Sequence, residues 1–299
     1  METRVLRYFV EAIRHRSITR AAEYLHVTQP TLSRQLKELE QELGQTLFKR
    51  VKYSIMPTAE GTVLYARALD ILAMVDRTEE EFRMMADFNG GEVAIGCAES
   101  QGMRIVARAV KQLQDRYPLF RIHLFSGNAE TVLERMDKGL LDFAVVLRGA
   151  NPSRFHACEL PHREEWGLLL RKDSPLSSMR EIPVEMLADL PLIISAYVTS
   201  GEMPEWLTTH LSHLNVRATY NLAFNAAILV QEGVGHALVI AGIVPTSAES
   251  VLCFRPIRPR IESTMRIIWN RSTILSRAAQ VFLDEVRLES PHAPAVTSV

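Results

Sequence analysis

The sequence predicts an α/β protein that begins with a winged helix-turn-helix, continues through a long linker helix and ends in a larger α/β domain. Apolar residues recur at helical spacing through residues 1–58, and a narrow apolar stripe with heptad spacing follows in residues 59–89. Strand-like and helical segments then alternate across residues 90–290. Residues 291–299 are small, polar and proline-containing, so we expect a flexible tail there.

The N-terminal segment is expected to fold as three short helices. The first has an amphipathic pattern, with apolar residues at Leu6, Phe9, Val10 and Ile13. Ser17 or Thr19 can cap the second helix, and Thr28 can cap the third. The third helix has Pro30 in its first turn, where the missing N–H costs nothing, and its apolar stripe is formed by Leu32, Leu36, Leu39 and Leu43. Gly44 can end this helix, and two short helices joined by a tight turn form a helix-turn-helix.

A small wing and a long helix are expected next. Residues 49–56 mix basic and β-favouring residues, and Thr58 can cap a helix that reaches about Asp87. Apolar positions on this helix step by four and three, which predicts a seam against a partner helix. The residues expected to dimerise along the seam are Leu64, Ala68, Ile71, Val75 and Phe82. The alternative is a helix that lies on its own domain.

Beyond Asn89 the pattern is typical of βαβ units on a mostly parallel sheet. The expected strands cover residues 93–96, 121–125, 142–147, 166–171, 192–195, 237–241 and 265–269. The expected helices cover residues 103–117, 129–138, 203–211, 226–232 and 276–288.

The charge distribution favours a polyanion as the partner of the N-terminal segment. Residues 1–58 carry a net charge of +4, and the rest of the chain carries −5. The outward face of the third helix holds residues suited to a DNA groove, namely Gln29, Pro30, Thr31, Ser33, Arg34 and Lys37. Arg50 and Lys52 on the wing could hold phosphates, and the capping residues Ser17 and Thr28 complete the candidate DNA-binding set. The alternative is a solvated polar face.

These residues carry a family resemblance. The stretch Ala21-Ala22-Glu23-Tyr24-Leu25-His26-Val27-Thr28-Gln29-Pro30-Thr31-Leu32-Ser33-Arg34-Gln35-Leu36 resembles the helix-turn-helix signature of LysR-type transcriptional regulators. Thr58-Ala59-Glu60-Gly61 resembles the start of that family's linker helix, and Gly139-Leu140-Leu141-Asp142-Phe143-Ala144 and Glu232-Gly233-Val234-Gly235 resemble motifs of its effector domain. The wing departs from the family pattern, because Lys49-Arg50-Val51-Lys52-Tyr53 lacks the usual glycine or asparagine turn.

The resemblance implies a domain order and a function. It divides the chain into a DNA-binding domain (1–58), a dimerising linker helix (59–89) and an effector-binding domain (90–290) like a periplasmic binding protein. Lobe I of this domain would cover about 90–162 and 266–290, and lobe II about 163–265, with crossings near Arg163 and Ile261. The implied function is a transcriptional regulator that binds double-stranded promoter DNA as a homodimer or homotetramer, with RNA polymerase as a further partner.

The resemblance also places an effector in the crevice between the lobes, against strand ends and helix N-termini. The expected effector residues are Ser100, Gln101, Gly102, Gly127, Asn128, Leu147, Arg148, Ser195, Ala196, Thr199, Asn225 and Gly235. Arg148 is the one fixed cation in this set and favours an anionic effector such as a carboxylate. It could equally pair with a neighbouring acid.

Other function classes are disfavoured. The chain has no nucleophile elbow, zinc-protease motif or phosphate loop, so we expect no catalysis, no metal and no cofactor. A solute-binding transport protein would need a secretory signal, and residues 1–20 lack one, so we expect a cytoplasmic protein with no membrane segment. Cys97 could serve a redox switch, but its apolar strand favours a buried structural thiol.

Overall fold

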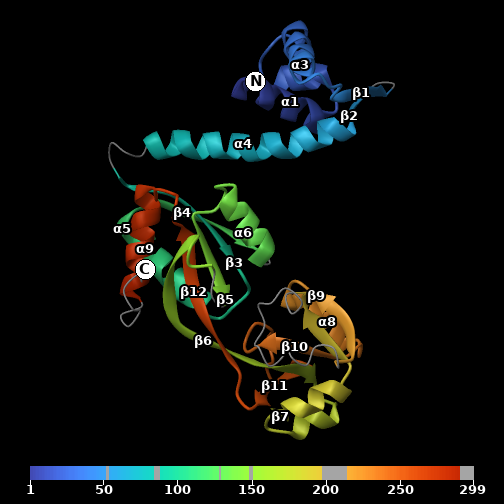
Figure 1. Ribbon diagram of the computed structural model, residues 1–299, viewed down its shortest axis with the longest axis vertical. Coiled ribbons are helices and arrows are strands. Elements are labelled where there is room, and N and C mark those ends of the chain that lie inside the picture. The colour runs from blue at the N-terminus through green and yellow to red at the C-terminus, as the bar shows by residue number, and fades with distance from the viewer. Residues whose placement is uncertain (52–53, 84–87, 128, 148–150, 197–213, 290–299) are drawn as a thin grey trace. The chain divides into compact units, whose positions relative to one another are not determined.

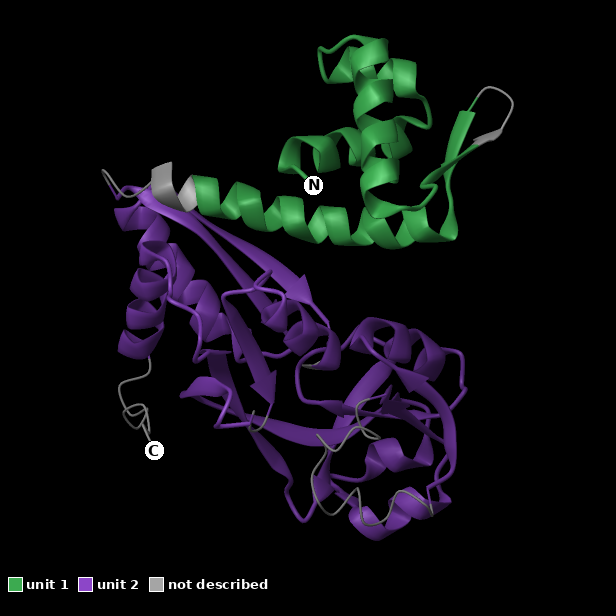
Figure 2. Ribbon diagram, turned by 45° about the horizontal axis from the view of Figure 1, so that its top comes forward, with its two compact units in different colours: residues 1–83 green, residues 84–299 purple. Residues whose placement is uncertain are grey.

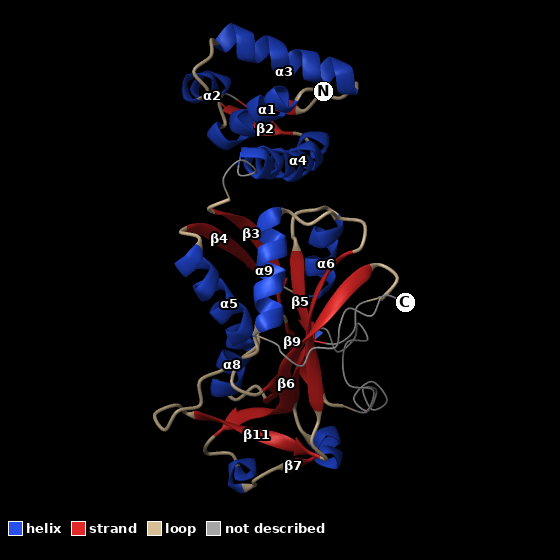
Figure 3. Ribbon diagram, turned by 90° about the vertical axis from the view of Figure 1, so that its left-hand side faces the viewer, coloured by secondary structure: helices blue, strands red, loops and turns tan. Residues whose placement is uncertain are grey.

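The computed structural model describes residues 1–51, 54–83, 88–127, 129–147, 151–196 and 214–289. The chain divides into two compact units, Met1–Arg83 and Met84–Val299 (Figure 2). Helices dominate the first unit, whereas the second combines sheets with covering helices (Figures 1 and 3). This organisation confirms the α/β class that the sequence predicts.

The first unit contains the helix-turn-helix, the wing and the long helix. Its elements are α1 (Thr3–His15), α2 (Ile18–Tyr24), α3 (Gln29–Leu43), β1 (Phe48–Val51), β2 (Ser54–Pro57) and α4 (Ala59–Arg83). The caps follow the sequence pattern, because Ser17 Oγ accepts the Arg20 N–H at 3.3 Å and Thr28 Oγ1 accepts the Thr31 N–H at 3.4 Å. Gly44 ends α3 in the left-handed conformation, with φ +64°.

The core of the first unit explains why α3 has its leucines where it does. Leu32, Leu36 and Leu39 are buried against apolar residues of α1 and α2, whereas Leu43, the last residue of the expected stripe, is 39% exposed. A helix fixed on its inner face by three leucines must turn its opposite face outward, because those positions lie half a turn away.

Helix α4 belongs to this same core over its first half. Ala68 is fully buried there, and Leu64 packs against the same cluster. Arg7 of α1 also pairs with Asp76 of α4. This arrangement corrects part of the expected dimer seam, since Leu64 and Ala68 contact their own domain and Ala68 presents no surface to a second chain. The side chain of Phe82 lies outside the described residues.

The wing is anchored to both neighbouring helices. Glu40 Oε1 at the end of α3 accepts the N–H groups of Leu47 and Phe48 at 2.7 and 3.3 Å. Thr58 caps α4 through the Gly61 N–H at 2.9 Å, as its position in the sequence predicts. A Cβ on Gly61 would collide with the carbonyl oxygen of Leu47, so glycine allows α4 to pass close to the base of the wing.

Lobe I of the second unit is a sheet with helices on both faces. Its elements are β3 (Gly90–Cys97), α5 (Met103–Arg116), β4 (Leu119–Ser126), α6 (Ala129–Asp137), β5 (Phe143–Leu147), the first part of β6 (Phe155–Arg171), β12 (Glu262–Asn270) and α9 (Arg277–Leu288). The strand order is β4-β3-β5-β12-β6. Helices α5 and α9 lie side by side on one face, and α6 covers the other (Figures 1 and 3).

Lobe II is built on the second part of β6. Its further elements are β7 (Ile182–Pro183), β8 (Leu192–Ser195), β9 (Val216–Tyr220), α8 (Ala223–Gln231), β10 (His236–Ile240), β11 (Leu252–Arg258) and two 3₁₀ helices, η1 (Pro175–Ser178) and η2 (Val184–Asp189). The strands continue in the order β6-β10-β8-β9, and β11 pairs with β6 and β7. The expected helix at 203–211 lies outside the described residues.

Strand β6 runs through both lobes. Strand β6 pairs with β12 over residues 155–165 and then with β10 and β11 over residues 166–171. The sequence pattern predicts a strand over only the last of these stretches. The first part alternates charged and buried residues around Pro161, which hides its strand character. Both lobes therefore share one uninterrupted strand of 17 residues.

Candidate nucleic-acid interface and ligand pocket

The outward face of α3 is free of packing. Gln29, Pro30, Thr31, Arg34 and Lys37 are exposed, and Ser33 is half-buried. Since Leu32, Leu36 and Leu39 hold the other side of the helix in the core, this face has a fixed direction. A rigid helix that presents hydrogen-bond donors on its first turns has the geometry needed to enter a DNA major groove.

The polar side chains on this face have only weak partners within the chain. Arg34 Nε lies 3.2 Å from Glu38 Oε1, and the two side chains are 77% and 51% exposed. Such a pair in solvent contributes little, so Arg34 can exchange Glu38 for another acceptor at low cost. Thr28 and Thr31 share a hydroxyl contact of 2.8 Å at the start of the helix.

The remaining candidate DNA contacts lie outside α3, on α2 and the wing. Half-buried Ser17 caps α2, and its hydroxyl is engaged with the Arg20 N–H. Arg50 belongs to strand β1, opposite Ile55 of β2. The side chain of Arg50 and the whole of Lys52 lie outside the described residues. The structure thus places the expected α3 residues on one helix, whereas Ser17 lies at the start of α2.

A ligand-sized pocket lies between lobes I and II of the second unit. The space between its walls is about 830 Å³, and this figure includes solvent at its open side. From lobe I it is lined by Ala98, Glu99, Gly127, Val132, Val145, Val146 and Leu147. From lobe II it is lined by Trp166, Ser195, Tyr220, Asn221, Leu222, Ala223, Ile240 and Ile243. Most lining residues follow the carboxyl ends of strands, where α/β folds commonly bind ligands.

The polar groups of the pocket are held by specific contacts. Glu99 Oε2, which follows β3 in lobe I, accepts the N–H of Ala223 at the start of α8 in lobe II, at 2.7 Å. Tyr220 donates its hydroxyl to the Leu238 carbonyl at 2.7 Å, and Trp166 Nε1 donates to Ser263 Oγ at 2.9 Å. Burial, and secondarily the charge of Glu99, raises the pKa of Tyr220 above its ordinary value, so its hydroxyl stays neutral.

The expected effector residues divide into three groups. Gly127, Leu147 and Ser195 line the pocket. Asn128, Arg148 and Thr199 lie outside the described residues. The others do not line it, namely Ser100, Gln101, Gly102, Ala196, Asn225 and Gly235.

Three of the residues away from the pocket lie in other surroundings. Asn225 is exposed on α8. Gly235 is buried where a Cβ would collide with the carbonyl oxygen of Pro191, so this glycine serves packing rather than ligand binding. Ala196 follows β8 in an exposed position.

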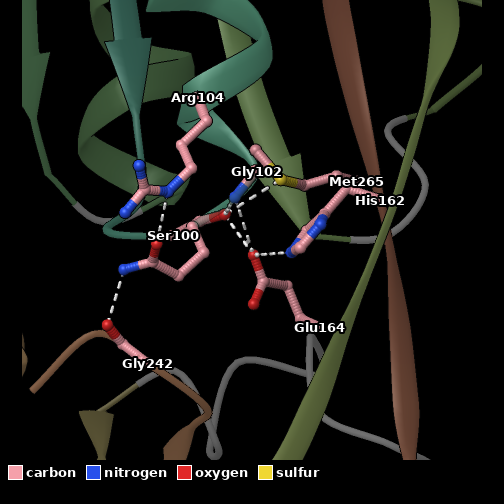
Figure 4. A network of polar contacts seen from close by, with 8 residues as sticks. Ser100, Gly102, Arg104, His162, Glu164, Gly242 and Met265 are labelled. Atoms are coloured by element: carbon pink, nitrogen blue, oxygen red, sulfur yellow. Dashed lines mark hydrogen bonds and ion pairs between the residues drawn. The ribbon is translucent and has the colours of Figure 1, made fainter.

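Ser100, Gln101 and Gly102 instead belong to a polar network where the chain crosses between the lobes, and Figure 4 shows Ser100 and Gly102 beside Glu164. Glu164 on β6 is 1% exposed, and its Oε1 accepts Ser100 Oγ and the Gly102 N–H, the latter at 3.3 Å. His162 Nε2 lies 3.2 Å from the same oxygen. The sequence predicts Ser100 and Gly102 as ligand contacts, but their polar groups are engaged by this buried carboxylate.

Gln101 links the two lobes directly. Its Nε2 donates to the Gly242 carbonyl beyond β10 at 2.6 Å, and its Oε1 accepts Arg104 Nε at 2.8 Å (Figure 4). Together with the bond between Glu99 and Ala223, this contact ties the start of α5 and the end of β3 to lobe II. The sequence analysis missed Glu99, Trp166 and Tyr220. Two of them have a signal in the sequence, since Glu99 lies three residues after the predicted strand 93–96 and Trp166 begins the predicted strand 166–171.

The three cysteines are expected to be unreactive in the folded protein. All are buried, and burial raises the pKa of the Cys97 and Cys158 thiols above their ordinary value, which disfavours the reactive thiolate. We expect a chromogenic disulfide reagent to label Cys97, Cys158 and Cys253 at neutral pH only after denaturation. Rapid labelling of native protein that disappears in Cys97→Ser would contradict this prediction and favour the redox alternative.

Two further features of the described residues bear on function. No described helix is long and apolar enough to cross a membrane. In the part of the chain that the structure describes, no group of three or more His, Cys, Asp or Glu side chains could hold a metal ion.

Comparisons with known proteins agree over both units. Residues 3–62 match the family model "Bacterial regulatory helix-turn-helix protein, lysR family", and residues 86–290 match "LysR substrate binding domain". The chain is 28% identical to the HTH-type transcriptional regulator BudR of Raoultella terrigena over 291 residues, which covers 95% of this chain and 99% of the relative. It is also 28% identical to the HTH-type transcriptional regulator BsdA of Bacillus subtilis (strain 168), with coverage of 95% and 99%.

Among solved structures, the fold is similar to that of full-length CbnR in complex with its target DNA. The TM-score is 0.74 at 19% sequence identity, with 97% of this chain and 100% of that chain covered. At this level of identity the likeness concerns the fold alone.

Proposed function

This chain belongs to the LysR family of transcriptional regulators, and from that premise we propose that it binds promoter DNA through the outward face of α3 and responds to a small effector held between its two lobes. The observation that carries the proposal is the exposed, polar and basic side of a helix whose opposite side is fixed by three buried leucines. In this proposal residues 1–58 bind DNA, residues 59–89 form the dimerising helix and residues 90–290 bind the effector.

The roles of the individual side chains follow from their chemistry. Arg34 can bond a guanine in a bidentate manner and Gln29 an adenine, whereas Lys37 suits a phosphate. Thr28, Thr31 and Ser33 can donate to bases or phosphates close to the helix start. Pro30 stiffens the first turn, Ser17 fixes α2, and Arg50 and Lys52 extend the basic surface along the wing.

The test is a gel-shift titration of the full chain with the DNA upstream of its own gene and with an unrelated duplex of equal length. We expect tighter binding to the upstream DNA, and binding to both that weakens steeply as salt is raised, because phosphate contacts release counterions. Equal affinity for the two duplexes, or no binding at low ionic strength, would refute the proposal.

The effector part of the proposal rests on the pocket between the lobes. A ligand changes DNA occupancy only if it binds two states of the protein with different affinity, and a pocket with walls from both lobes can distinguish open from closed arrangements. The sequence favours an anionic effector through Arg148, which lies outside the described residues. The described residues of the pocket include one acidic side chain, Glu99, and no basic one, so they do not themselves favour an anion.

We also propose self-association as a homodimer or homotetramer, supported by apolar side chains that the chain itself leaves uncovered. On α4, Val63 is 65% exposed, Met74 43% and Ile71 37%. Their spacing places them on one stripe, which is distinct from the buried Ala68. RNA polymerase as a partner and a cytoplasmic location stay predictions from the sequence.

The double variant Val63→Glu, Met74→Glu is expected to shift the protein towards monomer. Self-association would bury the two new carboxylates in an apolar contact without partners, which is unfavourable. Light scattering coupled to size-exclusion chromatography measures the change in mass. Ile274→Glu is the matched control, since Ile274 is an isolated residue that is 95% exposed in the second unit. An unchanged mass for the double variant would exclude this stripe as the contact.

A further inference from the structure

Among its described lining residues, the pocket between the lobes combines one acidic side chain with a mostly apolar surface. Glu99 is the one ionised side chain among the lining residues that the structure describes, and those residues include no Lys, Arg or His. The remaining described lining is mostly aliphatic, with Trp166 and Tyr220 as its aromatic members and Ser195 and Asn221 as its uncharged polar ones. A ligand that fits such a pocket combines a hydrocarbon body with a group that bonds a carboxylate.

The contacts of Glu99 leave it able to take a ligand. Its Oε2 accepts one hydrogen bond, from the Ala223 N–H, and the described residues supply no hydrogen bond to Oε1. A carboxylate has about four acceptor positions, so several are open here. Because the residue is exposed within the pocket, an incoming donor can reach it.

The same contacts disfavour an anionic ligand. The start of α8, where free N–H groups attract anions, already has the Glu99 carboxylate bound to it. The donors of the two aromatic lining residues are also engaged, Tyr220 with the Leu238 carbonyl and Trp166 with Ser263. A ligand carboxylate would have to displace Glu99 and would then lie beside its negative charge.

From these contacts we infer that the effector is an amine with an apolar body, whose ammonium group bonds Glu99. This inference rests on the proposed function, since it assigns the ligand class of the effector pocket. The hydrocarbon body would lie against the aliphatic lining residues, among them Val132, Leu147 and Ile240. An ammonium bound to Glu99 would lie beside the hydrogen bond that links Glu99 of lobe I to the Ala223 N–H of lobe II.

The test compares amines with carboxylates of the same shape by isothermal titration of the full chain. The probe pairs are 2-phenylethylamine with 3-phenylpropanoate, and isopentylamine with 4-methylpentanoate; 2-phenylethanol is the uncharged reference. We expect at least one amine to bind about tenfold or more tightly than its paired carboxylate, because a charge-assisted bond is gained in one case and a repulsion in the other.

Glu99→Gln separates charge from shape. Its amide oxygen can still accept the Ala223 N–H, but the charge is gone, so amine affinity should fall by about tenfold or more while affinity for 2-phenylethanol is unchanged. Glu92→Gln is the matched control, because Glu92 is an exposed carboxylate on β3 that does not line the pocket, and it should leave amine binding unchanged.

Three results would overturn the inference: a carboxylate that binds as tightly as its amine, an amine affinity that Glu99→Gln does not lower, or no binding by either amine. Gel shifts with the same preparations keep this failure apart from that of the proposed function. Wild-type protein that still prefers its upstream DNA remains a regulator whose effector belongs to another class.

Discussion

The double variant Arg34→Ala, Lys37→Ala is expected to lose about a hundredfold or more in affinity for its specific DNA at fixed salt. Both side chains are exposed on α3 and make no contact with the core of the first unit. A bidentate contact to guanine contributes about 1–3 kcal/mol of discrimination. A lysine on a phosphate adds affinity on any sequence. The gel-shift titration described above measures the change.

The single variants should separate the two roles. Arg34→Ala is expected to reduce the preference for upstream DNA, whereas Lys37→Ala is expected to weaken binding to both duplexes and to lower the salt slope by about one. The charge-matched control is Lys111→Ala with Arg121→Ala, two side chains that are each 70% exposed in the second unit. If the control loses as much affinity as the α3 variant, net charge rather than the α3 face governs binding.

Glu164→Ala is expected to destabilise the second unit by about 3–5 kcal/mol, the range seen when one partner of a buried charged network is removed. The carboxylate is 1% exposed and accepts hydrogen bonds from Ser100 and Gly102, with His162 beside it. Its removal takes the carboxylate acceptor from the Ser100 hydroxyl and the Gly102 N–H, which keep only weaker contacts, to Met265 Sδ and to Ser100 Oγ respectively. For a unit of this size the Tm should fall by about 10 °C.

Two further variants serve as comparisons for Glu164→Ala. Glu164→Gln should lose less stability than Glu164→Ala, because an amide oxygen can still accept the Gly102 N–H. Glu165→Ala is the neighbouring control: the Glu165 side chain is 28% exposed and pairs with Arg260 at 2.9 Å, so its loss should cost about 1 kcal/mol or less. Thermal unfolding followed by circular dichroism compares the three. Equal Tm values for Glu164→Ala and Glu165→Ala would show that the network contributes no special stability.

Local chemistry made the first unit predictable. The hydroxyls of Ser17, Thr28 and Thr58 cap helices wherever they precede an amphipathic segment, and Gly44 ends a helix because it adopts a positive φ readily. The spacing of the leucines on α3 fixed which side faces outward, and the exposed set is the one that the sequence pattern indicates. Each of these rules acts within a few residues along the chain.

The pocket and the helix seam depend on contacts between distant parts of the chain. The heptad pattern of α4 could not distinguish a partner helix from the core of the same domain, and Ala68 belongs to that core. Tyr220 on β9 and Trp166 on β6 line the same pocket although β10 and β8 lie between their strands, which no local pattern indicates. Ser100 was expected to bind ligand from its place after β3, but Glu164, 64 residues later, engages it instead.

The late position of β12 and α9 in the chain has a consequence for synthesis on the ribosome. Strand β12 lies between β5 and β6 in lobe I, and α9 fills the same core, yet both come from the last part of the chain. Residues 1–83 can fold as soon as they emerge, but lobe I must wait for residues 262–288. Until then β3, β4 and β5 expose apolar faces, so we expect the nascent chain to need protection from aggregation. A premature stop before residue 262 should yield insoluble protein rather than a lobe with partial function.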